Sequence, residues 1–389
     1  MSIDSAALPQ ALRRQARYAA GAAAAAHAGS FFLIGYWASF ARATAWLGPA
    51  SAAGVWLVCR LGSLLPQNRA GGGGAVFSDL GPAHNITLLR GVLTAQLAGF
   101  VLLPWPRMNA GPLPWPWLPG ALYGAAVILD GVDGWIARRS GRITRMGAQL
   151  DMETDAMGLL AASAVAVAAG KLPPALLAAG LAYYLLSGGV WIRTWLGKPS
   201  GTVRPWQGAR VIAGFQMAVV AAALLPPVGP RAAALAGWIV LVPLLTGFVR
   251  DWLIICRRAT NDCFTDAWWG RMLHGIATRW APVGGRFAAL LAAASWLALQ
   301  PWRGESAALA IAATFVGAGM AGRTAALIIV WISGAWISGG GPGAGSWVSW
   351  EMPVLFAASM VVLMTGTGPG SLWRPEDRLF ARRAGVRRC

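Results

Sequence analysis

The sequence predicts an all-α integral membrane protein, and two observations support this fold class. First, 57% of the 389 residues are hydrophobic and only 12% are charged, whereas soluble domains carry about 25% charged residues. Second, apolar runs that approach the roughly 20 residues of a membrane-spanning helix recur along the whole chain. Because a soluble fold would have to bury helices that are apolar on every side, we expect lipid to surround most of these helices.

The N-terminal part, residues 1–75, is expected to form a basic segment followed by a hydrophobic hairpin within residues 18–66. Since many further apolar runs follow, the first apolar segment is predicted to be a retained membrane helix rather than a cleaved secretory signal. Arg60 lies in the second segment and is expected either to snorkel to the surface or to face protein. A glycine run at 70–75 then separates the hairpin from the rest of the chain.

A central domain, residues 80–256, is expected to contain six membrane spans. The predicted spans are 86–104, 117–137, 147–169, 174–193, 208–226 and 232–255. Arginines gather in alternate loops, and we assign Arg90 to this loop charge together with the cluster from Arg138 to Arg145. By the positive-inside rule, that side faces the cytoplasm of an inner (cytoplasmic) membrane. The same pattern explains the net charge of +18, so no nucleic-acid partner is expected.

The C-terminal part is expected to comprise an interfacial linker, residues 257–285, and a four-helix membrane module with a basic cytoplasmic tail, residues 286–389. The apolar segments of the module are 286–300, 306–322, 324–338 and 351–366. Its ending, 365–370 (TGTGPG) followed by Leu372 and Asp377, resembles DoxX-like membrane proteins. Alternatively, this is a Gly/Pro turn that stops a helix before a basic anchor.

Acidic residues are concentrated in one short stretch of the central domain. Between Asp79 and Asp251 the sequence contains only Asp130, Asp133, Asp151, Glu153 and Asp155. Within each aspartate pair the spacing puts both side chains on one helix face, and the short loop 139–146 makes the two helices antiparallel neighbours. Carboxylates gathered at low dielectric repel one another unless cations neutralise them. Hard divalent ions, Mg²⁺ or Mn²⁺, are the natural partners of such oxygen ligands.

Other residues of this stretch suggest a nucleotide. Gly134 and Gly147 weaken their helices, which would be justified where a nucleotide approaches the backbone closely. Arg138 could pair with a phosphate, although an anchor obeying the positive-inside rule is an equal alternative. Glu153 lies on the opposite side of the helical wheel from Asp151. We therefore leave Glu153 out of the site and expect it to pair with loop arginines or to face headgroups.

These residues combine into one pattern: Asp130-x-x-Asp133-Gly134-x-x-Ala137-Arg138, eight further residues, then Gly147-x-x-x-Asp151-x-x-x-Asp155. The pattern resembles the signature of the CDP-alcohol phosphotransferase (CDP-alcohol phosphatidyltransferase) family, without departure at any position. The resemblance covers about residues 80–256 and implies a six-helix bundle. It leaves the N-terminal hairpin and the C-terminal module unexplained.

The family resemblance also implies roles for individual residues. Two metal ions, Mg²⁺ or Mn²⁺, would be surrounded by Asp130, Asp133, Asp151 and Asp155. Asp155 would also act as the catalytic general base. The cytidine diphosphate would be bordered by Gly134, Ala137, Arg138 and Gly147. On the preceding helix, Asn85 and Thr87, together with Arg90, look like the Asn-x-x-Thr-x-x-Arg element of the family with altered spacing, and Asn85 could instead cap the helix.

The predicted function is metal-dependent transfer of a substituted phosphate from a CDP-alcohol to an alcohol acceptor, with release of CMP, in phospholipid biosynthesis. We expect CDP-diacylglycerol as donor, while CDP-choline-like donors remain open. We also expect contact with membrane lipid, with a homodimer as a further option. A basic loop is the candidate acceptor site, and its residues are Arg193, Lys198, Arg204 and Arg210. Positive-inside charge alone would equally account for this loop.

Two other functions remain open at this point. A UbiA-like prenyl transferase also places aspartates and Mg²⁺ against a diphosphate, but it would need a second acidic motif, which the stretch from Asp251 to Asp266 does not offer. A non-catalytic membrane protein whose aspartates merely bind cations is the other alternative. Binding of CDP in the presence of metal would separate it from the enzyme.

Overall fold

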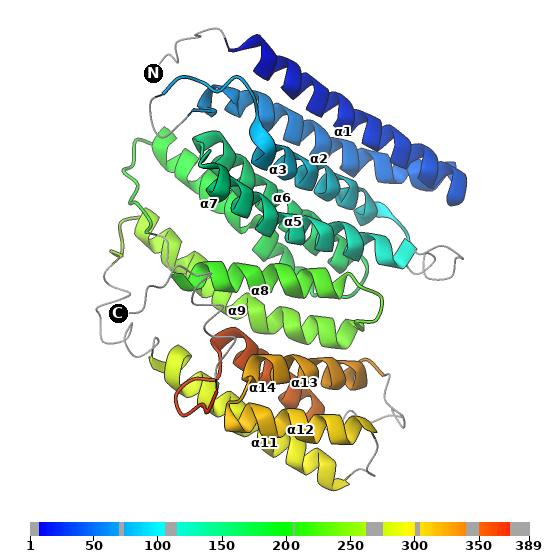
Figure 1. The fold of residues 1–389 in the computed structure, drawn as a ribbon, viewed down its shortest axis with the longest axis vertical. Helices are drawn as coiled ribbons and strands as arrows, with labels where there is room; N and C mark the ends of the chain where they lie inside the picture. Colours follow the sequence, from blue (N-terminus) through cyan, green and yellow to red (C-terminus); the bar gives the residue numbers. More distant parts are fainter. Residues whose placement is uncertain are drawn as a thin grey trace. The chain divides into compact units, whose positions relative to one another are not determined.

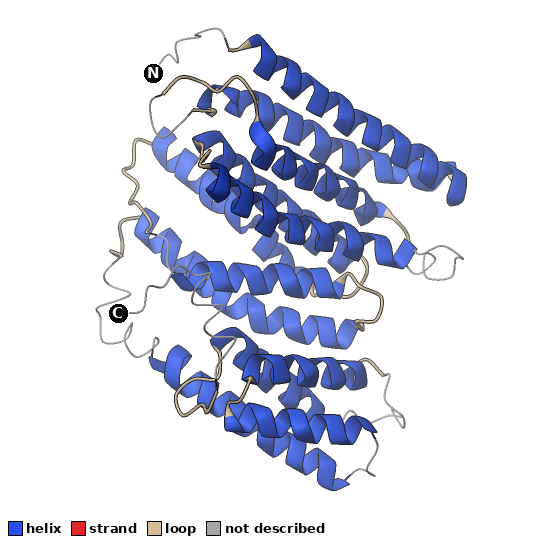
Figure 2. Cartoon of the chain, in the orientation of Figure 1, coloured by secondary structure: helices blue, strands red, loops and turns tan. Residues whose placement is uncertain are grey.

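The computed structural model describes residues 8–69, 74–105, 115–204, 207–261, 275–299, 304–339 and 350–373. Within these residues the chain forms twelve α-helices joined by short 3₁₀ and π turns, and no strand is present (Figure 2). The contacts divide the chain into two compact units. Unit 1 comprises Met1–Tyr184 and Val220–Pro226, and unit 2 comprises Leu185–Val219 and Pro227–Cys389.

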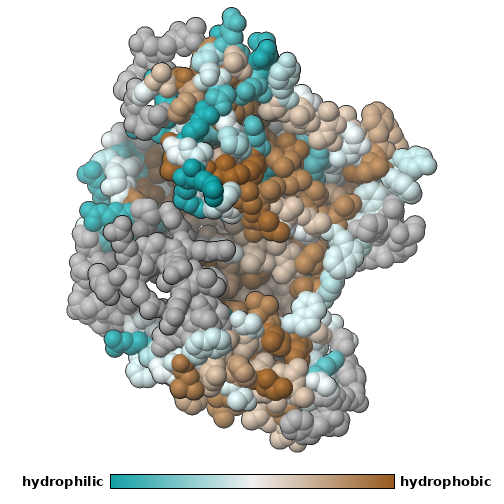
Figure 3. All heavy atoms as spheres, viewed as in Figure 1, coloured by the Kyte–Doolittle hydropathy of each residue, from teal (hydrophilic) through white to brown (hydrophobic). Residues whose placement is uncertain are grey.

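The helices have the length and composition of membrane spans. Six stretches of the described residues are long and apolar enough to cross a bilayer: Gln10–Trp37, Phe40–Gln67, Gly81–Leu102, Pro174–Trp195, Pro230–Ile255 and Thr278–Ala298. Large apolar side chains such as Phe32, Tyr36 and Trp195 are exposed, and apolar residues cover much of the face drawn in Figure 3. Soluble proteins rarely expose so much apolar surface to water. The chain is therefore an all-α, multi-pass membrane protein, as the sequence predicts.

Unit 1 is built around its third helix. In chain order its helices are α1 (Gln10–Trp37), α2 (Phe40–Leu64), α3 (Gly81–Ala98), α5 (Leu118–Ser140), α6 (Arg145–Ala168) and the first half of α7 (Leu177–Trp195) (Figure 1). Helix α3 packs against α2, α5 and α6. It is also the most buried of the candidate spans. Polar residues on α3 are therefore shielded from lipid by their neighbours.

A tight turn connects α5 to α6. Helix α5 ends at Ser140, and Gly141 follows with a φ of +65°, a left-handed conformation that glycine adopts at little cost. Helix α6 then starts after Thr144, whose hydroxyl accepts a hydrogen bond of 2.9 Å from the Gly147 N–H. The turn makes the two helices antiparallel, as predicted. However, each of them packs more extensively against α3 than against the other.

Unit 2 joins the last helix of the predicted central domain to the C-terminal helices. Its helices after α7 are α8 (Gln207–Ala223), α9 (Pro230–Ile255), α11 (Ala281–Leu299), α12 (Gly304–Ala318), α13 (Gly322–Ile337) and α14 (Glu351–Thr365). A single apolar core contains Val240 of α9 together with Trp296, Leu309, Ile329 and Leu355. The C-terminal helices thus share their core with α9.

The compact units divide the chain differently from the predicted domains. The boundary between the units falls inside α7 and α8, within the predicted domain 80–256, because α9 buries apolar residues against α13 and α14. Helix α11 begins at Ala281, within the predicted linker 257–285. Residues 262–274 of that linker lie outside the described residues.

The end of the C-terminal module is a turn after α14. The helix stops at Thr365, and Gly366 follows with a φ of +84°. The Arg286 guanidinium donates hydrogen bonds of 3.2 Å to the carbonyls of Thr367 and Pro369. The predicted turn that stops the helix is therefore present. The resemblance to DoxX-like proteins stays a prediction, and the basic tail lies outside the described residues.

Candidate active site

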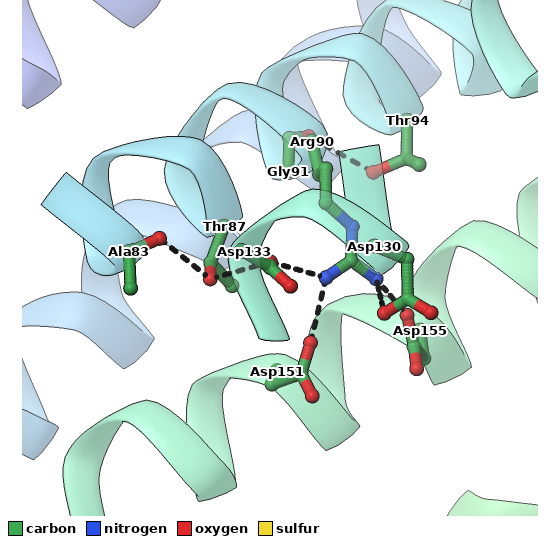
Figure 4. A network of polar contacts seen from close by, with 9 residues as sticks. All are labelled: Ala83, Thr87, Arg90, Gly91, Thr94, Asp130, Asp133, Asp151 and Asp155. Atoms are coloured by element: carbon green, nitrogen blue, oxygen red, sulfur yellow. Dashed lines mark hydrogen bonds and ion pairs between the residues drawn. The ribbon is translucent and has the colours of Figure 1, made fainter. Parts of the chain in front are cut away.

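The aspartates of the motif converge from two helices on an arginine of a third. Asp130 and Asp133 lie on α5, and Asp151 and Asp155 lie on α6. All four carboxylates point toward the guanidinium of Arg90 on α3 (Figure 4). The spacing argument that paired the aspartates on single helix faces is consistent with this arrangement.

Arg90 contacts each of the four carboxylates. Its Nη1 donates hydrogen bonds to Asp133 Oδ2 at 2.7 Å and to Asp151 Oδ1 at 2.6 Å. Its Nη2 lies 2.9 Å from Asp130 Oδ1 and also donates to Asp155 Oδ1. The assignment of Arg90 to the cytoplasmic loop charge was wrong. Arg90 lies inside α3. Its charge can be accommodated there because carboxylates of α5 and α6 neutralise it.

The cluster has a buried end and an open side. The side chains of Arg90 and Asp133 are 3% and 6% exposed. Thr87 Oγ1, also on α3, donates a 2.9 Å hydrogen bond to Asp133 Oδ2. The other three carboxylates are more accessible, with Asp155 at 28% and Asp151 at 43%. A ligand would therefore approach from the side of these three acids.

Three of the acids could share a metal ion. One carboxylate oxygen each of Asp130, Asp151 and Asp155 lies within 4.8 Å of the others, the one such group found in the described residues. One guanidinium against four carboxylates leaves a net charge of −3 when all four are ionised. Oxygen donors and a residual negative charge are what hard divalent cations require. The residues present therefore fit such an ion.

The glycines of the motif lie in crowded surroundings. A Cβ on Gly147 would come 2.8 Å from His84 Nε2, and a Cβ on Gly134 would come 3.1 Å from Arg138 Nη1. The His84 ring also lies 2.9 Å from Thr144 Oγ1, the cap of α6. Gly147 thus allows α3 to approach the start of α6. This close packing explains the glycine at position 147, in addition to the predicted contact with a nucleotide. Ala137 follows on α5, near the same end of the helix.

Asn85 lies away from the cluster. Helix α3 begins at Gly81, so Asn85 stands inside the helix and does not cap it. Its side chain is exposed, whereas those of His84 and Thr87 are buried. His84, Thr87 and Arg90 follow one another at intervals of three residues and share a helix face. The residue beside Thr87 that faces α6 is therefore His84, and contact of Asn85 with a nucleotide stays a prediction.

Glu153 does not pair with a loop arginine. It is buried on α6, and its carboxylate accepts hydrogen bonds from Arg60 of α2, with Nε to Oε2 at 2.6 Å and Nη2 to Oε1. Gln149 Nε2 adds a bond of 3.1 Å to Oε1. Arg60 thus faces protein, which decides between the two expectations for that residue.

The predicted acceptor residues belong to unit 2. Arg193 donates from Nη2 to the Pro199 carbonyl at 2.7 Å and from Nη1 to Cys256 Sγ at 3.6 Å. Lys198 is exposed, and the Arg204 backbone N–H donates to Asn261 Oδ1 at 2.9 Å. The side chain of Arg210 lies outside the described residues. Arg193 thus has a local structural role, whether or not it also binds an acceptor.

Fold and site together define a multi-pass membrane protein with a cluster of aspartates among its helices, whose carboxylates are suited to hold a cation. A model of the CDP-alcohol phosphatidyltransferase family matches residues 82–258, a segment that contains the whole aspartate motif. This segment is therefore a domain of the CDP-alcohol phosphatidyltransferase family, as the sequence predicts. The domain is therefore that of a phosphotransferase, which moves a phosphate group from a CDP-alcohol. No match is found among curated proteins or among solved structures.

Sequence reasoning missed the central role of Arg90 and the position of His84. A signal was available in the spacing of three residues that links His84, Thr87 and Arg90. A buried arginine in an apolar helix also requires carboxylate partners. The only acids between Asp79 and Asp251 are those of α5 and α6.

Proposed function

We propose that the chain is a metal-dependent enzyme of phospholipid biosynthesis that uses CDP-diacylglycerol as its donor and releases CMP. The observation that carries this proposal is the convergence of Asp130, Asp151 and Asp155 within 4.8 Å of one another, inside the family domain. A lipid donor is supported by the packing of the helices that carry these acids, α5 and α6, against α3, which is a candidate membrane span. A water-soluble CDP-alcohol would not require a site built among apolar helices.

These three acids, together with Asp133, would hold the divalent ions, Mg²⁺ or Mn²⁺, of which we propose two. When bound, the ions would neutralise the diphosphate and the charge that develops on the transferred phosphorus. Mg²⁺ in proteins is commonly held by one or two carboxylates together with substrate phosphates. The partly open side of the cluster, where Asp151 is 43% exposed, supports that type of site.

Asp155 is the proposed general base. It accepts the proton of the acceptor hydroxyl while the acceptor oxygen bonds to the β-phosphorus of the donor. The bond between that phosphorus and the bridging oxygen breaks, and CMP leaves. Asp133 lies at the buried end of the cluster, where hydrogen bonds from Thr87 and Arg90 fix the orientation of its carboxylate. Gly134, together with Ala137, Arg138 and Gly147, would border the cytidine diphosphate.

The active site is proposed to face the cytoplasm of an inner membrane. Arg138 and Arg139 occupy the last turn of α5, and Arg142 and Arg145 follow in the turn and at the start of α6. Positive charge of this density marks the cytoplasmic end of membrane helices.

The acceptor is proposed to be a phosphorylated alcohol bound by the basic loop of unit 2. Lys198 offers an exposed ammonium group there. Arg193 has hydrogen-bond partners within the loop and would contribute charge rather than a free guanidinium.

The proposal is tested with purified protein, CDP-diacylglycerol and a panel of alcohol acceptors, by following CMP release. We expect CMP only when Mg²⁺ or Mn²⁺ is present, and we expect Asp155→Asn to abolish it. Asp251→Asn is the matched control, because Asp251 also lies in a helix of the family domain but pairs with Arg250 at 2.9 Å. CMP release that persists in Asp155→Asn, or in the presence of EDTA, would contradict the mechanism. Activity with a soluble CDP-alcohol alone would contradict the lipid donor.

A further inference from the structure

Helix α2 lies outside the family-matched segment 82–258, yet it contacts both helices that face each other across the acidic cluster. One of them is α3, which carries Arg90, and the other is α6, which carries Asp151 and Asp155. Helix α2 contacts α6 through an ion pair and α3 through close packing.

The contact with α6 is an ion pair. Arg60 donates two hydrogen bonds to Glu153, and the Glu153 side chain is only 5% exposed. Glu153 and Gln149, which also donates to it, share the face of α6 opposite to Asp151 and Asp155. Burying a carboxylate without its partner costs free energy. The ion pair therefore fixes the position of α6 along α2 and the rotation of α6 about its own axis.

The contact with α3 depends on two glycines. The Leu57 side chain packs onto Gly91, the residue after Arg90, where a Cβ would come within 2.6 Å of Leu57 Cδ2. Eight residues further on, the Trp46 ring packs onto Gly99, the first residue of the 3₁₀ turn that follows α3. The Trp46 Nε1 donates a 3.1 Å hydrogen bond to the carbonyl of Gln96, which lies on α3. Two separate contacts along α3 prevent it from sliding or rotating against α2.

We propose that α2 is a positioning part of the active site: Arg60 anchors α6 through Glu153 while Leu57 and Trp46 seat α3, so that the N-terminal hairpin sets the distance between Arg90 and the acids. This inference rests on the proposed function of the aspartate cluster. A displacement of α6 by about 1 Å would move Asp151 and Asp155 together, and misplacements of that size can reduce catalysis by about 100-fold. Arg60 is thus a positioning residue and touches no substrate.

The test compares full-length variants in detergent. Arg60→Met and Glu153→Gln each break the ion pair, and the reversed pair Arg60→Glu/Glu153→Arg can reform it. Arg42→Met removes another arginine of α2, one that lies near the start of the helix, and serves as the control. The readouts are the Kd for Mn²⁺, measured from free Mn²⁺ by electron paramagnetic resonance, and the kcat and KM of CMP release.

We expect the two single variants to bind Mn²⁺ about tenfold or more weakly than wild type, as is typical when a group that orients metal ligands is removed. Their kcat should fall as well, and the reversed pair should recover most of both losses. Arg42→Met should behave as wild type. Single variants whose Mn²⁺ affinity and kcat equal those of Arg42→Met would overturn the proposal.

A variant that unfolds would not decide the question, so Arg60→Lys is included. Lysine keeps the charge but lacks the planar fork that bonds both carboxylate oxygens. We expect this variant to remain folded, by its thermal melt, and to bind Mn²⁺ with an affinity between those of wild type and Glu153→Gln. An unchanged affinity would count against the anchoring role.

Failure of the proposed function gives a different result. A wild-type chain that binds Mn²⁺ but releases no CMP from any CDP-alcohol would contradict the function. The role of α2 would then be decided by the Mn²⁺ affinities of the variants alone. A wild-type chain that binds no Mn²⁺ would overturn both proposals.

Discussion

Replacing Arg90 by methionine should make the stability of the protein depend on divalent metal. Arg90 is the one cation of the cluster among the described residues, and its guanidinium reaches Asp130, Asp133, Asp151 and Asp155. Methionine has a similar length but no charge. Without Arg90 the four carboxylates would face one another with a net charge of −4, unless protons or metal ions replace the guanidinium.

The size of the effect is set mainly by the most buried of the four pairs. Arg90 and Asp133 are 3% and 6% exposed, and breaking a buried ion pair from one side costs about 3–5 kcal/mol. The carboxylates of Asp130 and Asp151 are 39% and 43% exposed. Their pairs with Arg90 are screened by solvent and add about 0–1 kcal/mol each. In EDTA, Arg90→Met should therefore unfold at a midpoint on the order of 10 °C below that of wild type.

Added Mg²⁺ or Mn²⁺ should restore much of this loss. An ion at 100 times its Kd stabilises the folded state by about 2.7 kcal/mol. Its affinity should rise when it no longer competes with a guanidinium for the same oxygens. The assay is thermal unfolding by tryptophan fluorescence in EDTA and in saturating metal, with Arg90→Lys as a variant that keeps the charge. Equal metal-induced shifts in wild type and Arg90→Met would refute the idea that arginine and metal neutralise the same carboxylates.

Three further predictions concern residues around the cluster and the acceptor loop. Gly147→Ala should destabilise the protein by about 1–3 kcal/mol through overpacking, because its Cβ would come 2.8 Å from His84 Nε2, and His84→Ala in the same chain should recover part of the thermal midpoint. The hydrogen bonds from Arg142 lower the pKa of Asp79, so this pair stabilises the protein fully above the unfolded pKa near 3.9 and ceases to do so as pH falls through the lower folded value. The thermal midpoint of Asp79→Asn should therefore lie below that of wild type at pH 7, and the difference should shrink below about pH 4; a difference that stays constant with pH would contradict the pair. Lys198→Gln should raise the KM for a phosphorylated acceptor and leave kcat unchanged, whereas an unchanged KM would reduce the loop to positive-inside charge.

The helices and the motif could be predicted because the signals that encode them are local. Apolar runs in the sequence coincide closely with the helices of the structure, from α3 through α9. The spacing within each aspartate pair puts both members on one face of α5 or of α6, whatever packs against it. A four-residue turn that contains Gly141 then makes these helices antiparallel. Each inference used residues within about one or two helical turns.

The errors concern side chains whose partners are distant in sequence. Arg90 was assigned to a loop, and Asn85 was considered as a helix cap, because the sequence does not indicate where α3 begins or which of its faces meets α5 and α6. The structure pairs Arg90 with Asp133, 43 residues away, and Arg60 with Glu153, 93 residues away. Hydropathy cannot predict these pairs, since an arginine in an apolar helix has the same local signal whether it snorkels or faces an acid.

The sequence by itself determined that this chain is a helical membrane protein and which carboxylates share a helix face, because helical periodicity and hydropathy depend only on near neighbours. Only the tertiary structure decided which cation neutralises those carboxylates and that a helix outside the family domain contacts both sides of the cluster. Such contacts depend on the rotation and depth of each helix against the others. These are set by packing at residues such as Gly91 and Gly99, where the absence of a side chain allows two backbones to approach closely.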